Sequence, residues 1–219
     1  MRIIVISAHP DDETLGCGAT LLKHGANGDD LFWLIVTQAH EPQWPASVIA
    51  RKATEVERVA EAYGMKEYFR LGFPTTQLDV TPEAGLIESI RERLAYVKPD
   101  IVYVVYGGDV HSDHRAVFSA TTAVLKPIYM SSLGVRKLLC YETLSSTEAA
   151  AFPGFTPTAF NDVSPYLERK LQIMELYETE GQGDLMPRGS SAIRALARHR
   201  GATIGVEYAE AFSLVRELM

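Results

Sequence analysis

Short apolar runs alternate with helix-like segments along most of this chain, and this alternation limits the folds that it can adopt. The clearest runs, 3–6 and 101–106, are rich in β-branched residues, which suit strands buried on both faces of a parallel sheet. The other predicted strands are 31–37, 68–71 and 137–141. We therefore predict an α/β fold, a Rossmann-like, doubly wound and mostly parallel sheet with helices on both faces.

Helix-like segments separate these runs. In the clearest one, apolar residues recur at intervals of three and four from Ile87 to Val97. Further helices are predicted at 14–24, 47–63 and 116–125. From Thr147 on, the chain contains two more helix-like segments but no strong strand alternation. We predict a single domain over 1–219, in which 146–219 flanks or caps a core of about 1–145.

The length, charge and cysteine content of the chain limit the kinds of partner and environment that we expect for it. A chain of 219 residues can bury roughly 70% of its unfolded surface in one domain. The formal charge of −7 and the lack of a basic stripe argue against nucleic acid, and no apolar run approaches the roughly 18 residues of a membrane span. Cys17 and Cys140 are expected to be small buried residues, and so low a cysteine count favours a reducing cytoplasm.

The stretch Ala8–Glu13 (AHPDDE) lies between the first predicted strand and the first helix. His9 and Asp12 can both face one metal ion, while Asp11 stays free for proton transfer. A simple helix cap also fits, because carboxylates are favoured in a first helical turn, and we expect Glu13 to serve the helix terminus. Capping does not account for the histidine.

A second polar stretch, Asp109–Arg115, holds two histidines and two carboxylates directly after a predicted strand. Doubly wound sheets bind ligands where the strand order reverses, between the first and fourth strands of a 3-2-1-4-5 order. We therefore expect the two stretches to face each other. His9, Asp12 and one of His111 and His114 would hold a divalent ion with an open position for water, as hydrolytic zinc sites do.

At this point the sequence resembles the PIG-L/LmbE family of zinc-dependent N-acetylglucosaminyl de-N-acetylases, over nearly its full length. The motifs that carry the resemblance are AHPDDE at 8–13, GCGA at 16–19, HSDHRAV at 111–117, Arg51 with Glu55, Tyr141-Glu142, and the tail from Arg200-Gly201 through Gly205 to Tyr208-Ala209-Glu210-Ala211-Phe212.

The resemblance implies a role for each matching residue. It implies His9, Asp12 and His114 as ligands of one Zn²⁺ per chain, with Fe²⁺, Mn²⁺ or Co²⁺ as other occupants. Asp11 would be the general base for the metal-bound water. His111 would stabilise the oxyanion or protonate the departing amine, and Asp113 would hold His111 in its tautomer. The implied reaction removes an acetyl group from an amino-sugar substrate, and the family makes a homo-oligomer plausible.

Two features leave the substrate open. Arg51 is a candidate substrate-binding residue, although a solvated helix charge explains it equally well. The stretch Tyr177–Gln182 departs from the pattern of many bacterial relatives in a region that tends to shape the pocket.

Two other functions fit the same residues. Two histidines and a carboxylate also hold non-haem iron in oxygenases, although that chemistry would leave Asp11 without a task. A non-catalytic ligand-binding module is the other alternative. A dinucleotide module is disfavoured, because HPDDE rather than GxGxxG follows the first strand.

Overall fold

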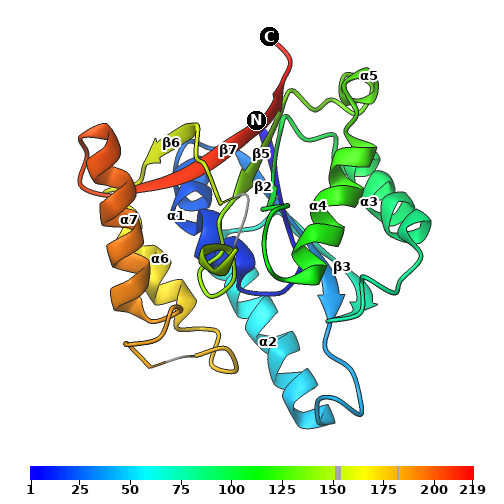
Figure 1. The fold of residues 1–219 in the computed structure, drawn as a ribbon, viewed down its shortest axis with the longest axis horizontal. Coiled ribbons are helices and arrows are strands. Elements are labelled where there is room, and N and C mark those ends of the chain that lie inside the picture. The colour runs from blue at the N-terminus through cyan, green and yellow to red at the C-terminus, as the bar shows by residue number, and fades with distance from the viewer. Residues whose placement is uncertain (151–153, 182) are drawn as a thin grey trace.

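The computed structural model describes residues 1–150, 154–181 and 183–219. Within these residues one seven-stranded sheet has the order β3-β2-β1-β4-β5-β7-β6 (Figure 1). Its strands are β1 Arg2–Ser7, β2 Asp30–Gln38, β3 Glu67–Pro74, β4 Ile101–Val105, β5 Lys137–Tyr141, β6 Ala159–Asp162 and β7 Ala209–Glu217. Strands β1 to β5 are parallel, and β7 runs antiparallel to both β5 and β6. The predicted 3-2-1-4-5 order and the α/β fold class are confirmed.

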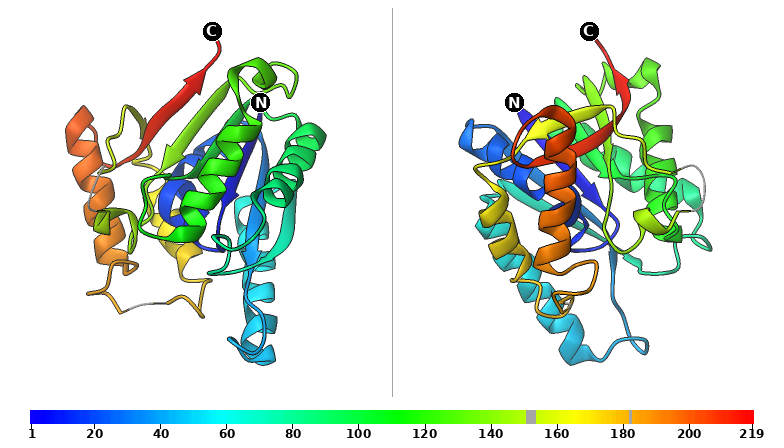
Figure 2. Two further views of the ribbon diagram at one scale, coloured as in Figure 1. Left: turned by 45° about the vertical axis from the view of Figure 1, so that its right-hand side comes forward. Right: turned by 60° about the vertical axis from the view of Figure 1, so that its left-hand side comes forward.

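Helices cover both faces of the sheet, as predicted. The described helices are α1 Asp12–Ala26, α2 Ala46–Tyr63, α3 Glu83–Val97, α4 Ser112–Val124, α5 Pro127–Met130, η1 Thr147–Ala149, α6 Leu167–Met174 and α7 Ser190–Ile204. Helices α3 and α4 pack together on one face, whereas α1 contacts α2 and α6 on the other (Figures 1 and 2). In the described parts of the chain, no helix combines the length and hydropathy that crossing a membrane requires.

The central strands form the core. All four side chains from Ile3 to Ile6 are completely buried, which agrees with a strand covered on both faces. Cys17 and Cys140 are buried and unpaired, as predicted.

A buried ion pair connects the start of α1 to the C-terminal strand. Helix α1 loses helical geometry at Cys17, where φ is −140° and ψ is 17°. The N–H groups of Ala19 and Thr20 therefore donate to the carboxylate of Glu210, at 3.0 and 2.7 Å. Lys170 Nζ donates to Leu15 O at 2.8 Å and to Glu210 Oε1 at 2.7 Å. The pair thus replaces helical hydrogen bonds within a buried region, where unpaired backbone groups would be costly.

Two details of the predicted fold were wrong. The last third of the chain is more than flanking helices, because β6 and β7 extend the sheet. Small residues such as Ala209 and Ala211 hide the apolar alternation by which a strand is recognised. The third strand also continues past Leu71 to Pro74, since Gly72 adopts a φ of 74° near a register shift against β2.

Candidate metal centre

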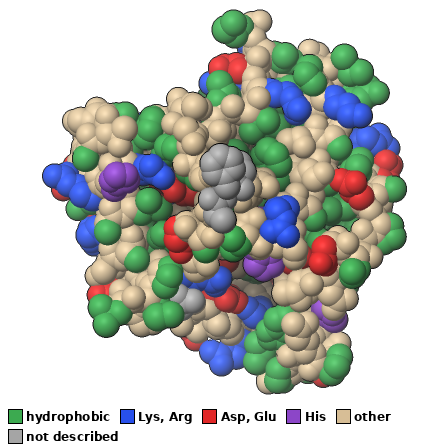
Figure 3. All heavy atoms as spheres, in the orientation of Figure 1, with side chains coloured by type: hydrophobic (Ala, Val, Ile, Leu, Met, Phe, Trp, Pro, Cys, Tyr) green, Lys and Arg blue, Asp and Glu red, His purple; other side chains and the backbone are tan. Residues whose placement is uncertain are grey.

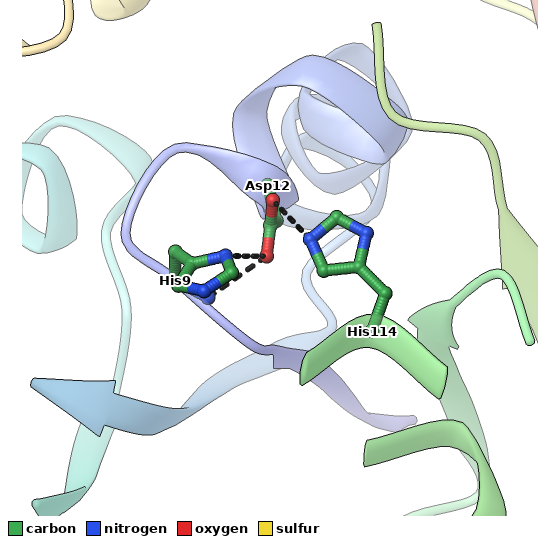
Figure 4. Close-up of side chains that lie close together, drawn as sticks. All are labelled: His9, Asp12 and His114. Carbon is green, nitrogen blue, oxygen red and sulfur yellow. Dashed lines mark hydrogen bonds and ion pairs between the residues drawn. The ribbon is translucent and has the colours of Figure 1, made fainter. Parts of the chain in front are cut away.

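The two polar loops meet at the carboxyl ends of β1 and β4. These strands are adjacent and parallel, with Ile6 opposite Val104, so the loops that follow them lie side by side. His9 and Asp12 come from the β1–α1 loop and the first turn of α1, and His114 comes from the first turn of α4 (Figure 4). The space-filling view shows a hollow on this face with histidine, acidic and basic side chains at its rim (Figure 3).

Asp12 lies between two histidine rings, as Figure 4 shows. Its Oδ1 is 3.3 Å from His114 Nε2, and its Oδ2 is 3.5 Å from His9 Nδ1. One ligand atom from each of the three residues lies within 4.8 Å of the others. This donor set of two imidazoles and one carboxylate fits a divalent ion such as zinc. The structure therefore brings together the three ligands that the family resemblance implies, and their metal role remains a prediction.

The two histidines also set the charge of Asp12. Burial alone would raise the pKa of this carboxyl, but His114 and His9 beside it hold the pKa well below its usual value. Asp12 and Asp109 in turn outweigh the effect of burial on His114 and raise its pKa to about 10. The carboxylates and imidazoles of this cluster therefore stabilise opposite charges on one another.

Asp11 is buried beside this cluster in an unusual backbone conformation, with a φ of 104°. Glu13 Oε2 accepts a hydrogen bond from the Asp11 N–H at 3.1 Å, and Arg188 Nη1 lies 2.7 Å from Asp11 Oδ2. Burial raises the pKa of Asp11 to about 7, and Arg188 acts in the opposite direction. A carboxylate with a pKa near neutrality can accept and return a proton at neutral pH.

Glu13 supports the helix terminus, as expected, but from a fully buried position. Its Oε1 accepts hydrogen bonds from Tyr177 OH and Thr14 Oγ1, both at 2.6 Å. Burial raises the pKa of this carboxyl to about 7. One carboxylate oxygen of Glu13 therefore holds the backbone of Asp11, and the other accepts a hydrogen bond from Tyr177, which belongs to the C-terminal third of the chain.

His111 is the N-cap of α4, and its ring lies against the rings of His9 and His114. Its ring centroid is 4.5 Å from that of His9 and 4.9 Å from that of His114. Burial, together with His9 and His114, lowers the pKa of His111 to about 4, so the ring is neutral at neutral pH. Its Nδ1 accepts a hydrogen bond from the Asp113 N–H at 3.2 Å, which leaves Nε2 to carry the ring proton.

The carboxylate of Asp113 contacts a different histidine from the one predicted. We expected it to hold His111, but its Oδ2 lies 2.9 Å from His9 Nε2. The reason is the β3–α3 loop, whose Thr76 and Leu78 N–H groups donate to the same carboxylate at 2.7 and 3.1 Å. Only the backbone of Asp113 hydrogen-bonds to His111 Nδ1.

Arg51, the candidate substrate-binding residue, is not among the residues that line the cleft around His9, Asp12 and His114. Its side chain is 60% exposed and lies 3.7 Å from Glu178 Oε2. The next residue, Lys52, lines the cleft and pairs with Glu180. Consecutive helical residues point about 100° apart, so Arg51 and Lys52 lie on different sides of α2.

Replacing Arg51 by alanine should therefore leave kcat/KM within about twofold of wild type, because exposed surface pairs contribute little. The matched variant Lys52→Ala should raise KM, since it removes a cation from the cleft wall. Steady-state kinetics of both variants on one N-acetylated amino sugar test this difference. A larger effect for Arg51→Ala than for Lys52→Ala would contradict the placement.

Several cleft residues were not found from the sequence. Arg188 approaches from the segment between α6 and α7, at a position that carries no recognised motif. The stretch Tyr177–Gln182 contributes Glu180 to the cleft wall and Tyr177 beneath it, whereas Gln182 lies outside the described residues. Asp109 belongs to the second polar stretch, but nothing in the sequence indicated its role.

Comparison with known proteins places the chain in a family. The family model described as PIG-L, GlcNAc-PI de-N-acetylase, matches residues 4–125. The diacetylchitobiose deacetylase of Thermococcus kodakarensis is 26% identical over 98% of this chain and 83% of that protein.

Solved structures share the fold across almost the whole chain. The N,N'-diacetylchitobiose deacetylase of Pyrococcus horikoshii superposes with a TM-score of 0.79, at 20% identity over 98% of this chain and 83% of that one. GalB of Pseudomonas putida, a 4-carboxy-2-hydroxymuconate hydratase, superposes with a TM-score of 0.77, at 15% identity over 100% and 97% of the two chains. The fold therefore supports more than one chemistry, and the function has to be argued from the site. Because the family model matches more than half of the sequence, including both polar loops, the chain belongs to the PIG-L de-N-acetylase family.

Proposed function

We propose that this protein is a zinc-dependent hydrolase that removes the acetyl group from an N-acetylated amino sugar of the GlcNAc type, or from its conjugate. The products are acetate and a free amine. The observation that carries the proposal is Asp12 between two histidines, with the buried carboxyl of Asp11 directly beside them. Family membership and the deacetylases among its relatives support it.

His9, Asp12 and His114 would hold the ion. Zinc bound there would acidify a water molecule and polarise the amide carbonyl. The same donor set accepts Fe²⁺, Mn²⁺ or Co²⁺, so zinc is our proposal for the occupant.

Asp11 and His111 would handle the protons and the developing charge. The Asp11 carboxylate takes a proton from water as the water oxygen bonds to the amide carbon. The Nε2–H of neutral His111 would donate a hydrogen bond to the carbonyl oxygen. Negative charge develops on this oxygen as the water oxygen bonds to the amide carbon. The C–N bond then breaks, the proton taken by Asp11 returns to nitrogen, and the amine leaves.

The proposal also explains why Asp11 is held so firmly. Glu13 and Arg188 fix its backbone and its carboxylate, at 3.1 and 2.7 Å. An oxygenase or a passive binding module built on the same three ligands gives no task to a buried carboxyl with a pKa near neutrality. Hydrolysis uses every one of these groups.

Zinc-loaded protein should release acetate and primary amine in equal amounts from at least one compound in a panel of N-acetylglucosamine, diacetylchitobiose, and N-acetylglucosamine linked to a polyol or a hydroxy acid. A chelator should abolish release, and added zinc should restore it, because the ion supplies both the acidic water and the carbonyl activation. The assay measures acetate enzymatically and amine by derivatisation. Oxygen uptake without acetate would point to the oxygenase, and release that resists complete metal removal would refute the zinc role.

A further inference from the structure

Asp109 is a buried carboxylate directly behind the metal-ligand cluster. It follows β4 and the pair Gly107-Gly108, and only 2% of its surface is exposed. Its Oδ2 lies 3.2 Å from His114 Nδ1. Its Oδ1 accepts a hydrogen bond from the His111 N–H at 2.8 Å. One carboxylate therefore contacts a predicted metal ligand and the backbone of its catalytic neighbour.

The loop after β5 fixes the orientation of this carboxylate. Ser146 Oγ and Thr147 Oγ1 both donate to Asp109 Oδ2, at 2.9 and 2.5 Å. Thr147 Oγ1 is itself held by the Thr143 N–H at 2.8 Å. Because the His111 N–H and two hydroxyl groups donate to it, the carboxylate cannot turn away from His114 without leaving buried groups unpaired.

The two nitrogens of His114 face two different carboxylates. Nε2 lies 3.3 Å from Asp12 Oδ1, inside the ligand cluster, and Nδ1 lies 3.2 Å from Asp109 Oδ2, the nearest carboxylate to this otherwise unpartnered buried nitrogen. His9 is arranged in the same way, with Nδ1 toward Asp12 and Nε2 toward Asp113 at 2.9 Å. A carboxylate on the outer nitrogen keeps the proton there and leaves the lone pair of the inner nitrogen for a metal ion.

We propose that Asp109 is a positioning residue for the metal centre: it locks the ring of His114 so that Nε2 faces the divalent ion, and thereby sets the affinity for that ion. The inference rests on the metal site of the proposed function. It goes beyond the family motifs, because it assigns a role to a residue outside the ligand set and connects the β5 loop to metal binding.

Asp109→Asn keeps the shape of the side chain but replaces one oxygen with an amino group. We expect zinc affinity, measured by competition with a chromogenic chelator, to fall about 10- to 100-fold, as when other carboxylates behind metal-bound histidines are lost. The visible spectrum of the Co²⁺-loaded protein should also change, because the ring of His114 is no longer held. Asp109→Ser should show the same two effects.

The matched control is Glu148→Ala, which removes the exposed hydrogen bond from the Ser145 N–H to Glu148 Oε1 in the β5 loop, at 2.8 Å, but leaves Asp109 and its hydroxyl donors in place. Its zinc affinity should stay within about threefold of wild type, well below the loss expected when the carboxylate itself is removed. Equal losses in the control and in Asp109→Asn would assign the effect to loop packing and overturn the proposal. So would wild-type zinc affinity in Asp109→Asn, or failure of both Asp109 variants to fold.

Zinc affinity and acetate release are measured separately, so the failure of one proposal can be distinguished from the failure of the other. If wild-type protein binds zinc but releases no acetate from any compound of the panel, the proposed function fails while the role of Asp109 is still decided by the affinities. If wild-type protein binds no divalent ion, the metal site itself is wrong, and both proposals fall.

Discussion

Asp11→Asn should lower kcat by about 10²- to 10⁴-fold, the contribution typical of a positioned general base, while zinc remains bound. The amide cannot accept a proton from water, but it has the size of the carboxyl. Asparagine also tolerates the left-handed backbone region better than alanine does, which matters at a φ of 104°. The measurement is kcat at saturating substrate, alongside zinc content by elemental analysis.

Arg188→Met separates the loss of the base from the loss of its cationic neighbour. This variant removes the guanidinium 2.7 Å from Asp11 Oδ2 but leaves the carboxylate in place. Its kcat should fall much less than that of Asp11→Asn. Full activity of zinc-loaded Asp11→Asn would remove Asp11 from the mechanism, and loss of zinc from that variant would make Asp11 a ligand instead.

The sequence was sufficient to predict the strand order around the site. Buried parallel strands such as 3–6 and 101–106 leave a strong signal, because both of their faces must be apolar. Once those strands are paired, chain connectivity alone places AHPDDE beside HSDH at the point where the order reverses. Long-range geometry was therefore accessible wherever the local signal was strong.

Contacts that loops make with one another could not be predicted from the sequence in this way. The histidine that Asp113 contacts is decided by the N–H groups of Thr76 and Leu78, which belong to another loop. Arg188 reaches Asp11 from 177 residues away in the sequence. No periodicity marks such residues, because a loop that lines a cleft has neither a buried face nor a repeat.

The sequence also did not indicate which side chains of helix α2 face the cleft. Arg51 and Lys52 are adjacent basic residues on α2, and only Lys52 lines the cleft. The apolar positions of this helix fit one face only partly, so its rotation could be judged to no better than one residue. A motif match to Arg51 could not correct that uncertainty.

Asp12→Ala should weaken zinc binding more than any substitution behind the ligands, by over about 100-fold, and should reduce acetate release to the level seen with a chelator. Among the described residues, Asp12 is the one carboxylate that contacts both His9 and His114, through Oδ1 to His114 and Oδ2 to His9. Its Oδ2 also accepts the His9 N–H at 2.8 Å. The substitution therefore removes a ligand and loosens a second one.

The thermal stability of this variant distinguishes a lost ligand from a damaged fold. Zinc at about 100 times its Kd should stabilise wild-type protein by about 2.7 kcal/mol, which corresponds to a rise in Tm of roughly 5–11 °C for a chain of this size. Asp12→Ala should show no such rise, and Asp30→Ala should keep it, because Asp30 is an exposed carboxylate paired with Lys66. A zinc-dependent rise in Asp12→Ala equal to that of wild type would mean that the ion binds elsewhere, and the ligand assignment would have to be abandoned.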